Sequence, residues 1–103
     1  MAEASDIIAA LSEMQDEAQR LILLRFFKTG PGEYGEGDRF LGLRVPQTRE
    51  VVKRFRLSMP LVQIAELLRS PWHEVRLCGF LLLVEEMKAA TPSKRIAPTE
   101  YAD

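Results

Sequence analysis

The sequence predicts an all-α fold, a stack of antiparallel helix pairs with about five helices and no sheet. Apolar residues recur at the spacing of one helix face in several segments of the chain. Those segments are short and most of them are separated by turns with proline or glycine, which is typical of stacked helical hairpins. No segment alternates apolar and polar residues in the way that predicts a half-buried strand.

Two short helices are predicted before Gly30. The first spans about residues 5–14, and its apolar face consists of Ala4, Ile7, Ile8 and Leu11. The second begins near Asp16, because Asp16 and Gln19 have the spacing of a capping box. It carries a run of large apolar side chains and stops before the Gly30-Pro31 pair.

A glycine-rich loop and a third helix follow. Residues 29–44 contain five of the six glycines of the chain and are predicted to form an ordered loop. Pro46 suits the first turn of a helix, where its missing N–H group would be unpaired anyway. The buried face of this helix is predicted to consist of Thr48, Val51, Val52 and Phe55. Another face carries a row of cations, Arg49, Lys53 and Arg56.

A fourth helix is predicted to follow Pro60. It repeats the spacing of one apolar face with Leu61, Ile64, Ala65 and Leu68. Ser70 and Pro71 are then suited to act as the N-cap and first-turn proline of a fifth helix, over about residues 72–89.

The fifth helix contains an unbroken apolar run over residues 77–84. Periodicity alone could assign this run to a buried strand, but its length and flanks favour a helix that needs neighbours on several sides. Residues 91–103 contain two prolines and few apolar residues. We therefore expect a helical domain over residues 1–90 and a tail over residues 91–103.

Charge is unevenly distributed along the chain. The net charge is -1, so the total does not demand a nucleic acid or a membrane as partner. Residues 20–56, however, contain nine Lys and Arg against four Asp and Glu. Local positive charge of this kind suits contact with phosphates. The same cations could instead form an ordinary solvated helix face.

The remaining features indicate a cytoplasmic protein without a metal or another cofactor. Cys78 is the only cysteine, which excludes a disulfide framework and a cysteine-based metal site within one chain, and we expect it to be an inert core thiol. His73 and Glu74 are expected to cap and pack rather than to bind a metal. The N-terminus lacks the order of a signal peptide, and no apolar run approaches the roughly 18 residues of a membrane span.

The glycine-rich loop and the helix start after it carry the most specific motif. Residues 40–46, FLGLRVP, are followed by Arg49, and residues 70–76, SPWHEVR, open the fifth helix. In this order and spacing, over roughly residues 5–90, the chain resembles the N-terminal part of the AlkD-like DNA alkylation-repair family. The resemblance implies a curved stack of HEAT-like helical hairpins whose concave face holds duplex DNA.

The active members of that family excise cationic alkylated purines by hydrolysing the N-glycosidic bond, and a carboxylate stabilises the oxocarbenium-like sugar. We expect the resemblance to end after Ala90, before the family's catalytic Trp, Asp and Arg. No residue is therefore assigned a catalytic role, and the chain alone is expected to lack glycosylase activity because its catalytic region is missing.

The resemblance does carry over a DNA-contacting surface at the start of the third helix. The expected contact residues are Arg44, Gln47, Arg49 and Lys53, with Arg56 added from the cationic row. An alternative function is that of a helical scaffold, which binds another protein or itself through the apolar fifth helix. Apolar surface left exposed on that helix would favour such association.

Overall fold

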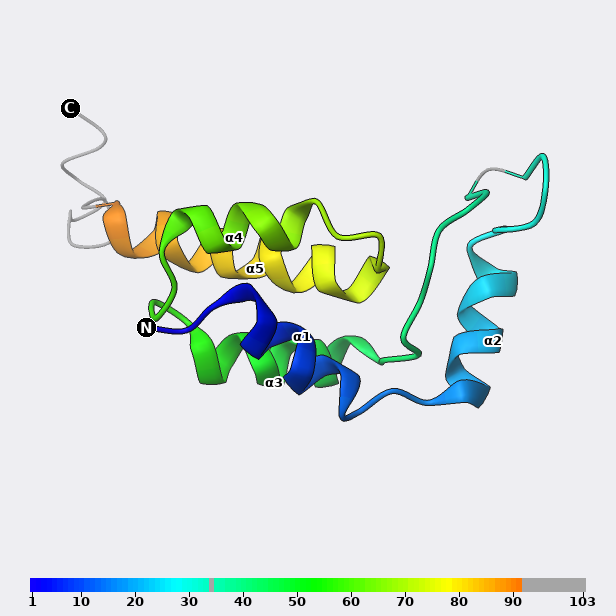
Figure 1. The fold of residues 1–103 in the computed structure, drawn as a ribbon, viewed down its shortest axis with the longest axis horizontal. Coiled ribbons are helices and arrows are strands. Elements are labelled where there is room, and N and C mark those ends of the chain that lie inside the picture. Colours follow the sequence, from blue (N-terminus) through cyan, green and yellow to red (C-terminus); the bar gives the residue numbers. More distant parts are fainter. Residues whose placement is uncertain (34, 92–103) are drawn as a thin grey trace, which may run out of the picture.

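The computed structural model describes residues 1–33 and 35–91, and these residues form five helices without a strand. The helices are α1 (Ala4–Ser12), α2 (Glu17–Phe26), α3 (Val45–Phe55), α4 (Leu61–Leu68) and α5 (His73–Ala90). Four of them lie side by side as one body, in which α4 and α5 form an antiparallel hairpin, while α2 stands at one end (Figure 1). The predicted all-α fold of five helices is confirmed. The tail predicted over residues 91–103 lies outside the described residues, except for Thr91.

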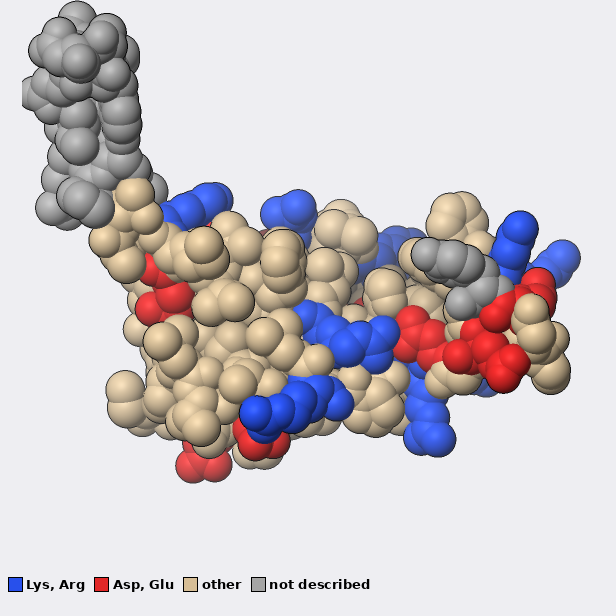
Figure 2. Space-filling view, turned by 90° about the horizontal axis from the view of Figure 1, so that it is seen from above, with Lys and Arg blue, Asp and Glu red and all other residues tan. Residues whose placement is uncertain are grey.

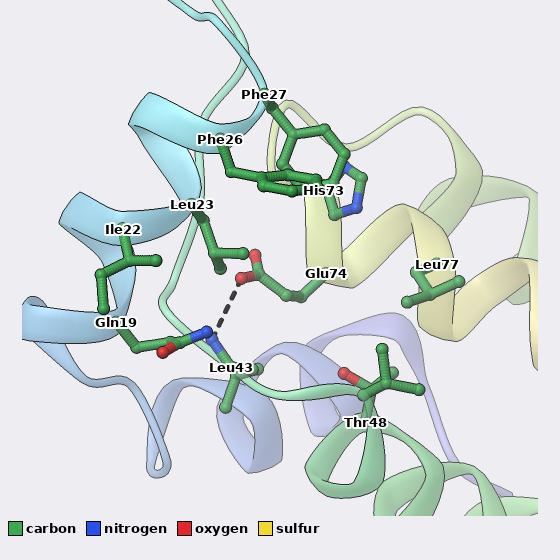
Figure 3. A pocket seen from close by; sticks show the side chains of 11 residues that line it. Gln19, Ile22, Leu23, Phe26, Phe27, Leu43, Thr48, His73, Glu74 and Leu77 are labelled. Atoms are coloured by element: carbon green, nitrogen blue, oxygen red, sulfur yellow. Dashed lines mark hydrogen bonds between the residues drawn. The ribbon is translucent and has the colours of Figure 1, made fainter.

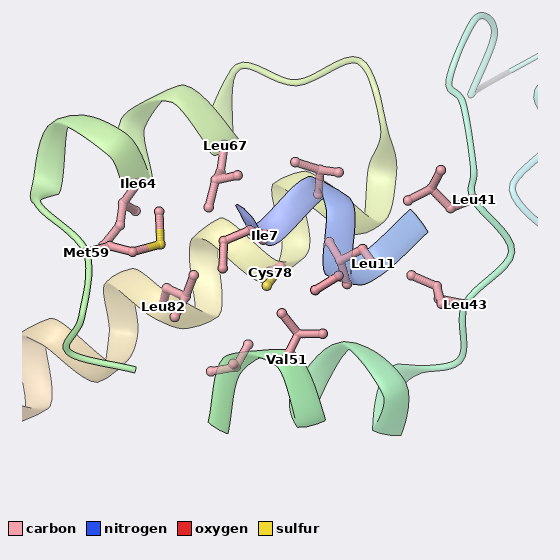
Figure 4. Close-up of a cluster of buried hydrophobic side chains, with 13 residues drawn as sticks. Ile7, Leu11, Leu41, Leu43, Val51, Met59, Ile64, Leu67, Cys78 and Leu82 are labelled. Atoms are coloured by element: carbon pink, nitrogen blue, oxygen red, sulfur yellow. The ribbon is translucent and has the colours of Figure 1, made fainter. Parts of the chain in front are cut away.

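The core forms around α5, which packs against α1, α3 and α4. On α5, Val75, Cys78 and Leu82 are fully or almost fully buried. They belong to one cluster with side chains from the other helices of the body and from the loop before α3, among them Ile7, Leu11, Leu43, Val51, Ile64 and Leu67 (Figure 4). Each fully buried aliphatic side chain of this kind contributes about 1.5–3 kcal/mol. The neighbours predicted for the apolar fifth helix are therefore present as three helices that pack against it.

The predicted starts of α2 and α3 agree with the structure, and the predicted start of α5 does not. The Asp16 carboxylate caps α2, accepting a hydrogen bond from the Gln19 N–H at 3.2 Å, and Pro46 lies in the first turn of α3. The prediction for α5 is wrong, because its N-cap is Trp72 rather than Ser70. The reason is a bridge to a distant segment: the His73 N–H donates to the carbonyl oxygen of Arg39 at 2.7 Å, and the helix begins only there.

The buried faces of the short helices are rotated from those predicted. In α4, Ile64 and Leu67 are buried whereas Leu61 and Leu68 are exposed. In α1, Ile8 is exposed and Ala10 is buried instead. Each helix is at most nine residues long and carries more than one possible apolar stripe, so the neighbouring helices decide which stripe is covered. In α3, the predicted Thr48, Val51 and Val52 are buried and Phe55 is half-buried.

The helix α2 differs from the rest because none of its residues is buried. Its large apolar side chains Leu21, Ile22 and Phe26 are 50%, 59% and 75% exposed. It makes no extensive helix–helix contact within the described part of the chain. The residues that hold α2 to the body therefore lie in the segments that flank it.

The core thiol predicted at position 78 is confirmed, since Cys78 is fully buried. Burial alone raises the pKa of the Cys78 thiol to about 12.

We expect Cys78 to react with a thiol reagent at pH 8 at least about a thousandfold more slowly in the folded chain than in urea. Each unit of raised pKa removes about nine-tenths of the reactive thiolate, and burial excludes the reagent as well. Stopped-flow labelling measures both rates. Equal rates in buffer and in urea would contradict the buried position.

Candidate nucleic-acid interface

The segment that leads into α3 is held by a buried carboxylate. Glu74, in the first turn of α5, is only 2% exposed. One of its oxygens, Oε1, accepts the Leu41 N–H at 2.9 Å, and Oε2 accepts the N–H groups of Gly42 and Leu43 at 3.0 and 3.1 Å. In Figure 3 the side chain points from α5 directly at this segment. Glu74 thus packs, as predicted, although its partner is a distant loop and not its own helix.

The other side of the same segment lies against the start of α2. Gly42 has a φ of +91°, and a Cβ atom there would lie 2.0 Å from the Asp16 carbonyl oxygen and 2.8 Å from the Arg20 nitrogen. The Asp16 N–H also donates to the Leu41 carbonyl oxygen at 3.2 Å. The chain from Leu41 to Leu43 therefore acts as a strap between α2 and α5, and we call residues 41–43 the strap.

The strap ends directly at the first residues of the predicted DNA-contacting surface. Arg44 is the N-cap of α3, and its side chain is exposed. The Gln47 side chain accepts the Arg44 N–H at 2.8 Å, so Gln47 also caps the start of α3, a role that was not predicted for it. The position of Arg44 is consequently fixed from both sides, by the strap and by the first turn of α3.

The cationic row of α3 opens onto a groove between α3 and α5. The groove has a volume of about 250 Å³ and is lined by Arg49, Val52, Lys53, Arg56, Leu81, Val84, Glu85 and Lys88. The three cations that the sequence placed in one row thus share one surface depression. The α5 wall adds Lys88 and Glu85, which were not among the residues predicted for this site. We call this depression the α3–α5 groove.

An ion-pair network crosses the α3–α5 groove. Arg56 Nε donates to Glu85 Oε1 at 3.0 Å, and Lys88 Nζ lies 3.6 Å from Glu85 Oε2. The hydrogen bond from Arg56, helped by the positive charges of Lys88 and Arg56, holds the pKa of Glu85 below its ordinary value against an opposing contribution from desolvation. Glu85 is therefore ionised at neutral pH. Its spacing to Lys88 was visible in the sequence, but its partner on α3 was not.

A second hollow lies between α2, α3 and α5 (Figure 3). Its volume is about 370 Å³, and most of its walls are apolar, including Ile22, Leu23 and Phe26. The hydroxyl oxygen of Thr48 at its edge is buried and has no hydrogen-bond partner among the described residues. Without a Lys or Arg in its lining, this hollow suits apolar groups rather than phosphates.

Aromatic rings close the end of that hollow nearest the glycine-rich loop. The His73 ring stacks on Phe40 with 4.6 Å between centroids, and Phe27 stacks on Phe40 at 5.2 Å. Asp38 accepts a hydrogen bond from Arg76 at 2.8 Å and lies 3.4 Å from the His73 ring. These contacts give His73 and Asp38 a structural role. No cluster of metal-ligating residues occurs among residues 1–33 and 35–91.

Charged side chains are unevenly spread over the face seen in Figure 2. Acidic and basic groups gather at the end of the molecule that carries α2 and the glycine-rich loop, whereas uncharged side chains cover much of the opposite half. No helix in the described part of the chain is long and apolar enough to cross a membrane.

Comparison with known proteins agrees with the family resemblance found in the sequence. A family model described as DNA alkylation repair enzyme matches residues 7–101. The match extends past Ala90, so the expectation that the resemblance ends there is wrong. No curated protein and no solved structure matches the chain. Because the family model covers most of its length, the chain belongs to the DNA alkylation repair enzyme family.

Proposed function

We propose that this chain is a DNA-binding module of alkylation repair, which forms the first hairpins of a HEAT-like stack and contacts the phosphates of duplex DNA. The contacts are made by Arg44, Arg49 and Lys53, and Gln47 and Arg56 assist them. The observation that carries the proposal is that the α3 cations share one groove in a chain of this family. Lys and Arg side chains that neutralise phosphates release counterions, which supplies binding energy without reading the sequence.

The dimensions of the cationic row fit a nucleic-acid backbone. Arg49 lies on α3 and Arg56 is the C-cap of that helix, seven residues later, which corresponds to about 10 Å along a helix. Successive phosphates of one DNA strand rise by about 3.4 Å along the duplex axis and also turn around it, so a row of this length can reach about two neighbouring phosphates. Arg44, held at the helix start, extends the row beyond the groove.

The charge reversal Arg49→Glu with Lys53→Glu is expected to weaken duplex binding more than about tenfold at low salt. Both side chains are exposed, so the fold is retained while two phosphate contacts become repulsive. Fluorescence anisotropy with a short duplex, plain or with an abasic-site analogue, measures the affinity across a salt series. The slope of log K against log[salt] should fall by about 0.9 for each lost phosphate contact.

A matched control separates the groove from net charge. Arg25→Glu with Arg69→Glu changes the total charge equally, but both residues are exposed and outside the groove. We expect a loss of less than about threefold from this control. Absence of binding by the wild-type chain at low salt, or equal losses in both double variants, would contradict the proposed function.

The activity of the family is the excision of alkylated bases, and we expect the 103-residue chain alone not to release 3-methyladenine or 7-methylguanine from alkylated DNA. The residues that line the α3–α5 groove include one carboxylate, Glu85, and it is already paired with Arg56. Chromatography of released bases, with heat-treated protein as the blank, measures this. Release above the blank would show that the chain is catalytic.

Self-association is a second candidate function, favoured by apolar side chains that remain exposed on α5. Phe80 and Met87 are 55% and 61% exposed. We expect light scattering at high protein concentration to give a mass above that of the monomer, and Phe80→Ser with Met87→Ser to lower it, because apolar contact area is lost. A clean monomer at high concentration would exclude this alternative, and high salt should not weaken such association as it weakens phosphate contact.

A further inference from the structure

The carboxylate of Glu85 lies where an anion would be held in the α3–α5 groove. It bonds to Arg56 on the α3 wall at 3.0 Å and lies 3.6 Å from Lys88 on its own helix. Arg49 and Lys53 line the same groove, so four cations and this single carboxylate face the depression. Two cations from different helices around one carboxylate resemble the surroundings of a bound phosphate oxygen.

We propose that Glu85 is an internal competitor for the phosphate that binds in the α3–α5 groove, and that Lys88 is a phosphate-binding residue on the second wall of this groove. This inference rests on the proposed function and extends it in two ways. It adds a residue of α5 to a surface assigned to α3 alone, and it gives an acidic side chain a role in setting affinity.

The exposure of the network allows the exchange. The side chains of Arg56 and Lys88 are 48% and 57% exposed, so their ion pairs with Glu85 are weak and readily broken. A phosphate that enters takes over Arg56 and Lys88, and the Glu85 carboxylate turns towards solvent. No covalent step is involved.

Competition by Glu85 also favours ligands with several phosphates. A single phosphate must displace the Glu85 carboxylate, and it gains contacts with only a few of the cations in the groove. A nucleic-acid backbone can engage Arg49 and Lys53 at the same time, which offsets the repulsion from Glu85. The arrangement therefore selects a polyanionic backbone over an isolated phosphate group.

The decisive comparison is between two neighbouring glutamates of α5. Glu85→Gln and Glu86→Gln each remove one negative charge, but of the two only Glu85 lines the groove. We expect Glu85→Gln to tighten duplex binding roughly three- to tenfold and to steepen the salt dependence, because Arg56 and Lys88 become free to release counterions. Glu86→Gln should change the affinity less than about twofold.

The second arm tests Lys88. Lys88→Gln should weaken duplex binding and reduce the salt slope by about 0.9, the value for one phosphate contact. Lys28→Gln removes the same charge far from the groove and should leave the slope unchanged. Inorganic phosphate, used as a probe, should compete with the duplex more effectively in Glu85→Gln than in the wild-type chain.

The outcomes separate this inference from the proposed function. Equal duplex affinities of Glu85→Gln and Glu86→Gln would overturn the role of Glu85 as a competitor. A salt slope of Lys88→Gln equal to that of the wild-type chain would overturn the role of Lys88 as a phosphate-binding residue. The proposed function would still hold in either case if the wild-type chain binds duplex DNA and the variant Arg49→Glu with Lys53→Glu does not. If neither the wild-type chain nor Glu85→Gln binds duplex at low salt, both proposals fall together.

Discussion

Replacement of Glu74 by glutamine is expected to lower the free energy of unfolding by about 3 kcal/mol or more. The wild-type carboxylate accepts three backbone N–H groups from the strap in a buried position. Glutamine retains one carbonyl oxygen and turns an NH₂ group towards donors. At least one buried N–H then loses its partner, and the remaining hydrogen bonds lose their charge assistance.

Urea unfolding followed by circular dichroism measures this loss. Glu86→Gln on the same helix is the control, because the Glu86 side chain makes no hydrogen bond or ion pair with the described residues, and this variant should stay within about 0.5 kcal/mol of wild type. A loss below about 1 kcal/mol in Glu74→Gln would show that the strap is held mainly by its apolar side chains. Since the strap positions Arg44, duplex affinity should fall along with stability.

Gly42→Ala is expected to destabilise the fold by at least about 3 kcal/mol, because two separate penalties meet at this position. The backbone φ of +91° disfavours any side chain, at about 1–2 kcal/mol. The new Cβ atom would also lie 2.0 Å from the Asp16 carbonyl oxygen, so the strap or the start of α2 must shift. Such a shift weakens the hydrogen bond between Asp16 and Leu41 as well.

A second glycine separates the two penalties. Gly37 has a φ of +84°, and nothing lies within 4 Å of its ideal Cβ position, so Gly37→Ala should cost only about 1 kcal/mol. Thermal and urea unfolding of both variants give the difference. Equal losses would mean that the backbone conformation alone requires glycine at position 42, and that the close approach of α2 does not.

The helices were predictable because their signals are local. Proline in the first turn of α3, the Asp16 cap of α2 and the spacing of apolar residues all act within a few positions. The buried stripe of α4 was not predictable, since an eight-residue helix with many apolar side chains offers more than one stripe. Only the position of α5 selects Ile64 and Leu67.

The residues of the candidate site that share one face of α3 could be predicted from the sequence. The contacts that α5 makes with other segments could not. The cations Arg49, Lys53 and Arg56 share a face because of helical periodicity, which one sequence reveals. Glu74 reaches a strap 31 to 33 residues earlier in the chain, and Glu85 reaches Arg56 29 residues earlier. Contacts of this range depend on how the helices pack, which no local pattern encodes.

The attachment of α2 has a consequence for how the chain opens and closes. No α2 residue is buried, and among the described residues it is linked to the body by the strap and by the Phe27 ring, which contacts the rings of Phe40 and His73. The strap can bind Glu74 only once α5 stands against α3, so α2 is expected to dock after the body has folded. In native-state hydrogen exchange, α2 and the glycine-rich loop should therefore open together as one foldon, at a lower free energy than the four helices around Cys78.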